Sequence, residues 1–496
     1  MSLDLQSLQR QRMPASPASS SMPGKGFAWG DVILYGLIAL VVFAPLPIGS
    51  VNEWSVMIIE LAALALAGLW LWRSPKPEMN PFLEKALVWP RRLFLAFGAV
   101  IVFQVIPLPK FLVRILSPGA FNFLSDFRPG FARSGFTSLS LVPGQTLREG
   151  LLVLSYFLVA LVVIHNIHRF SQIQKLVTAI IAIGTFEALF GLIQMSASSP
   201  SLLFYSKVIN TDSVTGTFVN RNHLAGFLEM ALPLAIGLAL ARIGLFALRD
   251  PKSRFDWRQF IGRFGGKALV TNILLFLAIL IMSVGLIRSR SRSGVFLLFF
   301  TFLLFGEIIM FHFGRAKEKQ KVSRNFINVA FVIILAFSAF VGLGAVVNRF
   351  LEEDTLLHGG RTVFWGNVVS VVRDFPLFGS GLGSFASVYP YYEHTGFEMR
   401  LTHAHNDYLE AASDIGLLGA ILLFAGIFFL LYRIFVTWRD RRSMEIKGIA
   451  MGGFVAIVIM LFHSLTDFNL HIPSNALLFA VILALTVVTV YHKKTS

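Results

Sequence analysis

The segment Thr402-His-Ala-His-Asn-Asp-Tyr-Leu-Glu410 continues as Ala411-Ala-Ser-Asp-Ile-Gly-Leu-Leu-Gly419 and then enters an apolar run. It ends the longest stretch between strongly apolar runs, residues 348–415, which gathers arginines and histidines beside a glycine-rich turn. Long polar loops of membrane proteins are where binding and catalytic residues concentrate. This junction therefore predicts a helical membrane protein whose chemistry lies in one large loop.

The composition of the chain supports a membrane protein. Of its 496 residues, 55% are hydrophobic and 14% are charged, whereas a soluble domain has about 25% charged residues. About 20 apolar residues are enough to cross the hydrocarbon core of a bilayer. Twelve runs approach this length, near residues 31–48, 53–72, 93–107, 149–166, 176–193, 223–241, 268–287, 294–313, 325–347, 416–432, 448–467 and 474–491.

We therefore predict an all-α polytopic integral membrane protein with about 12 transmembrane helices and a large, partly helical periplasmic loop. Residues 31–491 form a single transmembrane domain that includes the loop at 348–415. Residues 1–30 are polar and carry Ser and Pro, so they are expected to be a disordered cytoplasmic tail rather than a secretory signal peptide. Residues 492–496 form a second cytoplasmic tail.

The distribution of basic residues predicts the orientation of the chain. An even number of spans places both termini on one side. Segments on that side carry about twice as many of the 43 Lys and Arg residues as the segments on the other side. Since basic residues concentrate in the cytoplasm, both termini are expected inside and the loop at 348–415 outside.

Cysteine content and net charge exclude several classes of protein. The chain has no Cys, which removes disulfides, thiolate nucleophiles and Cys-ligated metal sites. A net charge of +16 would suggest nucleic-acid binding in a soluble protein. Here the richest basic loops, 242–267 and 315–321, fall on the predicted cytoplasmic side, where they act as topology signals near anionic lipid. Membrane lipid is therefore an expected partner and nucleic acid is not.

Several arginines fall on the predicted outer side, against the topology bias. Arg288, Arg290 and Arg292 lie between two apolar runs with almost no connecting length, and Arg361 and Arg373 belong to the large loop. The side chains of the triplet either snorkel to lipid headgroups or bind an anion as part of a site. Their position outside favours the second interpretation.

His405 is placed at the start of a predicted helix, because Asn406 is a suitable N-cap. The positive end of the helix dipole disfavours imidazolium there, so the ring would stay neutral and able to accept a proton. Two alternatives remain: a solvent-exposed or capping histidine, and a metal site in which His403 and His405 take a third ligand from Asp407 or Glu393. The surrounding arginines oppose a bound cation, so we expect no metal and no cofactor.

These residues resemble a known family. His405-Asn406, nine residues, Gly416, two residues and Gly419 is similar to the histidine motif of the O-antigen ligase and polymerase superfamily. Arg361 upstream in the same loop and Ser291-Arg-Ser-Gly294 at the start of an earlier span agree with that family. Thr217-Phe-Val-Asn-Arg-Asn-His-Leu-Ala225 is similar to its Asn-rich segment.

The resemblance implies an enzyme that transfers an oligo- or polysaccharide from undecaprenyl diphosphate to an acceptor hydroxyl at the periplasmic face of the bacterial inner membrane. The acceptor would be a growing glycan, a lipid A core or a protein. In such a metal-independent, inverting transferase, arginines hold the diphosphate and a histidine is the base. The predicted catalytic residues are His405, Arg361 and Arg292, and the predicted substrate-binding residues are Arg290, Arg221, Asn222, Asn406, Arg373 and His403.

A secondary transporter or flippase is the alternative, since a polytopic basic membrane protein fits either class. A transporter places ionisable residues within its spans near the midplane. A structure discriminates the two, because a central pathway lined by those residues would favour transport. The candidates for such a role within the predicted spans are few: Glu60, Glu187, Glu229, Glu307 and His463.

Overall fold

The structure is a computed structural model that describes residues 29–73, 79–196, 201–203, 205–207, 209–243, 266–313, 361–393 and 401–492. The predicted span at 325–347 and residues 348–360 lie outside this range. The α-helices are α1 (Trp29–Phe43), α2 (Glu53–Arg73), α3 (Pro81–Val105), α4 (Lys110–Leu116), α5 (Pro118–Phe127), α6 (Pro143–Asn166), α7 (Phe170–Met195), α8 (Arg221–Ile243), α10 (Lys267–Arg288), α11 (Arg292–Phe313), α13 (Arg361–Asp374), α14 (Phe385–Val388), α15 (Asp407–Asp440), α16 (Met444–His463) and α17 (Pro473–Tyr491).

Short elements complete the described part of the chain. The strands are two residues long and form two antiparallel pairs. β1 (Leu108–Pro109) pairs with β2 (Phe136–Thr137), and β3 (Ser201–Leu202) pairs with β4 (Tyr205–Ser206). The 3-10 helices are η1 (Ile48–Ser50), η2 (Phe131–Arg133), η5 (Tyr389–Tyr391) and η6 (Asn469–His471). In this described part, ten helices are long and apolar enough to cross a membrane, and α1 is a shorter apolar helix. The predicted all-α polytopic fold is confirmed.

The span predicted at 93–107 is much longer in the structure, where α3 covers Pro81–Val105. The Asn80 side chain accepts a hydrogen bond from the Phe82 amide at 3.1 Å, and Pro81 occupies the first helical position. Both features start a helix well. The first half of α3 also carries four charged residues, which lower its hydropathy and hid it from a search for apolar runs: Glu84, Lys85, Arg91 and Arg92.

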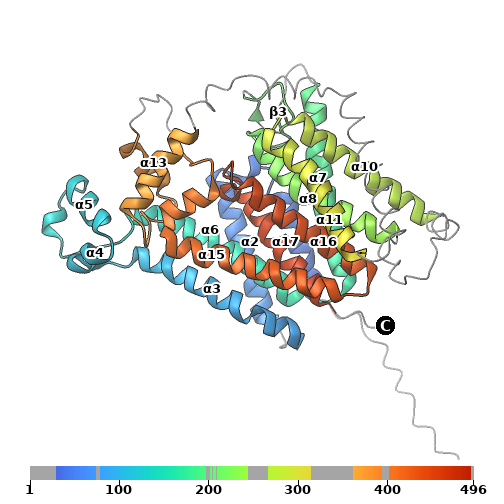
Figure 1. Cartoon of the computed structure of the whole chain (residues 1–496), viewed down its shortest axis with the longest axis horizontal. Coiled ribbons are helices and arrows are strands. Elements are labelled where there is room, and N and C mark those ends of the chain that lie inside the picture. Colours follow the sequence, from blue (N-terminus) through green and yellow to red (C-terminus); the bar gives the residue numbers. More distant parts are fainter. Residues whose placement is uncertain are drawn as a thin grey trace, which may run out of the picture.

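Three helices form the centre of the bundle. α8, α16 and α17 are almost completely buried, and the other long helices surround them (Figure 1). A Cβ added to Gly237 of α8 would lie 2.2 Å from the carbonyl oxygen of Gly448 of α16, so only glycine permits this approach of the two backbones. Small residues at such crossings are how membrane helices pack closely.

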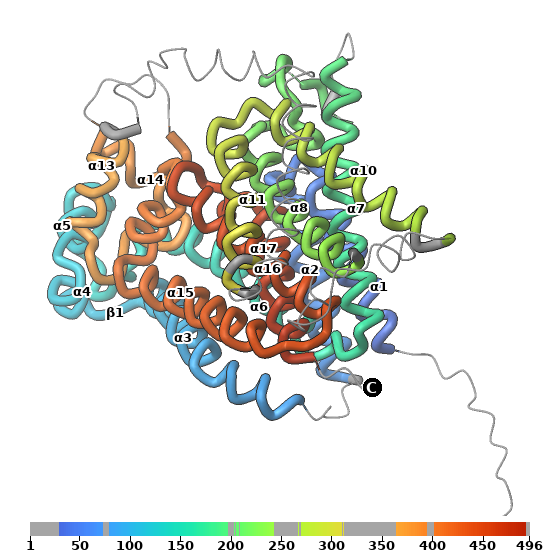
Figure 2. The backbone as a smooth tube through the Cα atoms, turned by 45° about the vertical axis from the view of Figure 1, so that its right-hand side comes forward, coloured from blue at the N-terminus to red at the C-terminus, as the bar shows by residue number. Residues whose placement is uncertain are grey.

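Both described ends of the chain lie at one end of the bundle. Asp31, at the start of α1, forms an ion pair with Arg169, which directly precedes α7. The ring of Phe170, at the start of α7, lies 5.9 Å from that of His492. α4, α5 and α13 lie together at the side of the bundle where α15 begins (Figure 2). This arrangement agrees with an even number of spans.

The orientation of the chain in the membrane stays a prediction. Reporter domains fused after Glu398 and after Ser496 are expected to report opposite sides of the membrane, with the C-terminal fusion in the cytoplasm, because of the excess of Lys and Arg on that side. Reporters that are active in only one compartment measure this directly. Both fusions reporting the same side would contradict the predicted topology.

The glycine-rich turn at 378–383 packs against a kink in α15. Gly416 interrupts the helix with φ +67°, a conformation that favours glycine. The carbonyl groups of Ser413 and Asp414 are released by this kink, and they accept the amides of Ser380 and Gly381 at 2.8 and 2.9 Å. The kink therefore separates a short first helix, which carries the predicted site, from the apolar span that follows.

Candidate functional site

The start of α15 is fixed by its N-cap, as predicted. The Asn406 side chain accepts hydrogen bonds from the amides of Tyr408 and Leu409 at 3.0 and 3.1 Å. Its amide group also donates to the carbonyl oxygen of Leu465 at 3.0 Å, so Asn406 is engaged within the protein. His405 precedes it with φ +49°, which is uncommon for a residue with a side chain. The cap therefore holds His405 beside the segment 464–472 that joins α16 to α17.

His405 faces a carboxylate from that segment. Its Nδ1 lies 3.3 Å from Oδ1 of the buried Asp467. Asn222, at the start of α8, donates to the other oxygen, Oδ2, at 2.6 Å, and the amide of Phe468 donates to Oδ1 at 2.9 Å. A carboxylate at Nδ1 orients the ring and favours the tautomer with the proton on Nδ1. Nε2 of His405 is then the nitrogen that can accept a proton.

The charge of Asp467 suits this arrangement. Burial by itself would raise the pKa of this carboxyl group, but the hydrogen bond with His405 and the nearby imidazole of His223 hold its pKa below the usual value. Asp467 is therefore an anion at neutral pH. An anion at this position stabilises the positive charge that His405 gains when it takes up a proton.

The ring of Phe468 separates His405 from a second histidine of the same motif. His403 stacks on Phe468 at 4.2 Å with an angle of 12° between the rings. His405 and His223 each meet Phe468 edge to face at 4.8 Å. The two histidines of His403-x-His405 therefore point to different surroundings. The structure does not place them to hold one metal ion together, which was the predicted alternative.

His403 belongs to a cluster of carboxylates and imidazoles. Its Nδ1 lies 2.7 Å from Oε1 of the buried Glu410, whose Oε2 accepts the Ala404 amide at 2.7 Å. His471 of η6 has Nδ1 2.7 Å from Asp407 Oδ1 and Nε2 3.5 Å from Glu410 Oε1. Burial would lower the pKa of His471, but Glu410 and Asp407 raise it to about 10.

The motif Ser291-Arg-Ser-Gly294, at the start of α11, contacts the same segment. Ser293 Oγ lies 2.8 Å from Thr466 Oγ1, next to Asp467. Arg292 is the first residue of α11 and is half-buried, whereas Arg290 forms an ion pair with Asp212. Arg221 begins α8, one residue before Asn222. The structure thus brings the starts of α8, α11 and α15 together.

Helix α13 approaches the site with its first turns. The indole of Trp365 donates to the carbonyl oxygen of Ala404 at 3.1 Å. Arg361 begins α13 one turn earlier, and its side chain lies outside the described residues. Arg373 is exposed in the last turn, about 12 Å further along the helix axis than Trp365. This contact with the segment that carries His405 comes from the first turns of α13.

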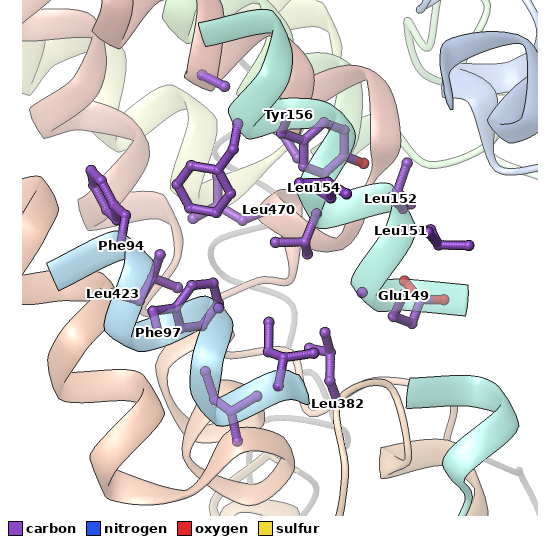
Figure 3. A pocket seen from close by; sticks show the side chains of 18 of the residues that line it. Phe94, Phe97, Glu149, Leu151, Leu152, Leu154, Tyr156, Leu382, Leu423 and Leu470 are labelled. Atoms are coloured by element: carbon purple, nitrogen blue, oxygen red, sulfur yellow. The ribbon is translucent and has the colours of Figure 1, made fainter. Parts of the chain in front are cut away.

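A cavity of about 1790 Å³ adjoins the site between α2, α3, α6, α15 and α17. Apolar side chains such as Phe94 and Phe97 of α3 and Leu423 of α15 cover much of its wall, and Glu149 of α6 also lines it (Figure 3). Its volume and lining fit a hydrocarbon chain. The polar residues that line it at the site end include Glu149, His403, Asp407, Glu410, Asp414 and His471, and those toward the other end include Arg91 and His165.

Asp467 and His471 were not predicted from the sequence. Both lie in Thr466-Asp-Phe-Asn-Leu-His471, and the span predicted at 448–467 wrongly included Thr466 and Asp467, because α16 ends at His463. One feature of the sequence could have indicated them: a short polar connection that contains ionisable residues and lies on the same predicted side as His405. Nothing in the spacing told which loop His405 contacts, because 62 residues separate it from Asp467.

Fold and site together define a polytopic helical membrane protein with a His–Asp pair beside a large apolar cavity. A family model described as O-antigen ligase matches residues 277–424, from α10 to the first half of α15. The chain is also 24% identical over 368 residues to "Exopolysaccharide production protein ExoQ" of Rhizobium meliloti (strain 1021). This alignment covers 68% of this chain and 73% of that protein. The resemblance to the O-antigen ligase and polymerase superfamily is confirmed, and both comparisons support a membrane glycan-processing enzyme of this kind.

Proposed function

We propose that the chain transfers an oligo- or polysaccharide from undecaprenyl diphosphate to an acceptor hydroxyl at the periplasmic face of the inner membrane. The observation that carries the proposal is the pair of His405 and Asp467, 3.3 Å apart, where the starts of three helices with the family's motifs converge. The similarity to an exopolysaccharide production protein favours a growing polysaccharide as the acceptor.

The proposed step needs one base and no covalent intermediate. Nε2 of His405 takes the proton of the acceptor hydroxyl while the hydroxyl oxygen attacks the anomeric carbon. The bond between that carbon and the phosphate oxygen breaks, and the electron pair leaves with the lipid diphosphate. Asp467 stabilises the imidazolium that results. Direct attack of this kind inverts the configuration of the anomeric carbon.

The departing diphosphate needs cationic partners. Guanidinium groups bind phosphate through two hydrogen bonds and offset the charge that grows during departure. Arg361 and Arg292 are proposed for this role because each begins a helix that contacts the segments around His405. No metal is assigned to the transfer step.

Arg361→Ala is expected to weaken donor binding about 10- to 150-fold, which corresponds to the ~1.5–3 kcal/mol of hydrogen bonds to a charged group. Arg361→Lys should recover part of this loss, because an ammonium keeps the charge but not the planar fork. Binding of a labelled lipid-diphosphate oligosaccharide to folded, detergent-purified protein measures both. Wild-type donor affinity in Arg361→Ala would remove Arg361 from the donor site.

A transfer assay tests the proposed function as a whole. Purified protein receives one lipid-diphosphate oligosaccharide together with a lipid-linked glycan, a lipid A core or a peptide acceptor in separate reactions. The proposal predicts a new glycosidic product with at least one acceptor. The cavity that extends toward Arg91 and His165 also fits a flippase, so donor movement across proteoliposomes without any product would favour that alternative.

A further inference from the structure

The cluster of His403, Glu410 and His471 has the composition of a metal site. The three donor atoms, one from each residue, all lie within 4.8 Å of one another. Two imidazoles and one carboxylate form a common ligand set for zinc. Ligands about 2.0 Å from a tetrahedral zinc ion are about 3.3 Å apart, so small side-chain movements would complete the geometry.

The surroundings of the cluster favour coordination. His471 directs Nδ1 to Asp407 Oδ1 at 2.7 Å, which leaves Nε2 facing the Glu410 carboxylate. A metal-binding histidine usually holds a carboxylate on its other nitrogen in this way. The Ala404 amide binds Glu410 Oε2, whereas Oε1 lies between the two imidazoles, 2.7 Å from His403 Nδ1 and 3.5 Å from His471 Nε2. The raised pKa of His471 places a proton on Nε2 toward this carboxylate in the metal-free protein, and a bound ion would take the place of that proton.

The cluster is also open to ligands. His403, Glu410 and His471 all line the apolar cavity, so a bound ion could exchange with a solution that reaches this cavity. Three protein ligands leave one tetrahedral position for water or for a group that enters the cavity. Arg221 and Arg292, which begin α8 and α11, are not among the described residues that line the cavity. The cluster therefore differs in charge from the proposed diphosphate site.

We propose that His403, Glu410 and His471 bind one divalent transition metal ion of the zinc type. His403 and Glu410 flank His405 in the sequence, and His471 belongs to the segment that carries Asp467. The ion therefore joins the two segments that hold the His405–Asp467 pair. The role of the ion is to fix the relative position of these two segments. This role is separate from the proposed transfer step and does not rest on it.

Zinc titration of the full-length, chelator-stripped protein tests the proposal. Calorimetry should show one tight site in the wild type, and His471→Ala and Glu410→Gln should lose it. Asp407→Asn should weaken zinc binding about 10- to 100-fold, as loss of an outer carboxylate partner does. His165→Ala is the matched control, because His165 lines the same cavity at its other end and stacks on Trp70. It should bind zinc as the wild type does.

X-ray absorption of the zinc-loaded wild type gives a second measurement that does not depend on variants folding. Two imidazole nitrogens and carboxylate oxygen in the zinc shell would support the site. The proposal is overturned if the stripped wild type binds no zinc, or if it binds zinc no better than His471→Ala. It is also overturned if added zinc does not displace the second proton of His471, so that the cluster is unchanged. Glycan transfer is measured separately, so its failure would not be confused with failure of zinc binding.

Discussion

His405→Ala is expected to lower the turnover of glycan transfer about 10²- to 10⁴-fold while the donor still binds. The imidazole takes the acceptor proton only in the transition state, and the donor diphosphate is held by other residues. Single-turnover transfer and donor affinity, measured on the same folded preparation, separate the two effects. A fully active His405→Ala protein would remove this histidine from the mechanism.

The same experiment extends to Asp467. Asp467→Asn keeps the volume but removes the charge that orients Nδ1 of His405, 3.3 Å away. We expect a large loss of turnover with unchanged donor affinity. In the double variant the losses should not add, because Asp467 acts through His405. Fully additive losses would show that Asp467 has a role independent of the histidine.

The second large effect is expected on stability. His463 Nδ1 lies 2.7 Å from Glu229 Oε2, and both side chains are fully buried between α16 and α8. Glu229→Leu alone leaves a polar imidazole without its partner and should destabilise the protein by about 3–5 kcal/mol. Replacing both residues with Leu should recover much of this loss, since an apolar pair needs no partner.

Thermal and denaturant unfolding in detergent measure this difference. The matched control is Glu307→Leu, because Glu307 is an exposed glutamate within α11. It should change stability far less. Equal stability of Glu229→Leu and the wild type would show that the pair does not hold α8 to α16.

Most of the ionisable residues that the sequence singled out within spans lie apart from the cavity. Of the five that the sequence singled out, Glu60 is the one that lines the cavity. Glu187 accepts a hydrogen bond from the Thr217 amide at 2.8 Å, and Glu229 is occupied by His463. Two of these glutamates therefore stabilise helix packing, whereas the polar groups of the cavity concentrate at the end near His403.

Local sequence features predicted much of this architecture. The N-cap at Asn406, the turn at 378–383 and the apolar runs all act within a few residues, so one sequence is enough to recognise them. The length of α3 was missed because charged residues in its first half reduce its hydropathy. Hydropathy measures solvation and not helix formation, so it marks where a helix is apolar and not where it begins.

Contacts between distant segments were harder to predict. His405 could be recognised from its motif, but its partner Asp467 comes from a loop that becomes adjacent only when α16 and α17 pack beside α8. The substrate-binding role of His403 stays a prediction, and its contacts with Glu410 and His471 were not predicted from the sequence. Such partners depend on helix packing, which the polarity of a single loop does not encode.

Release of the leaving group is the measurement that distinguishes glycan transfer from donor transport. Purified protein would be given a lipid-diphosphate oligosaccharide and an acceptor, and free lipid diphosphate and glycosidic product would be quantified in the same reaction. We expect one lipid diphosphate to be released for each glycan transferred, and both products to be lost together in His405→Ala. Donor that crosses the membrane intact, or product that forms equally well without His405, would contradict it.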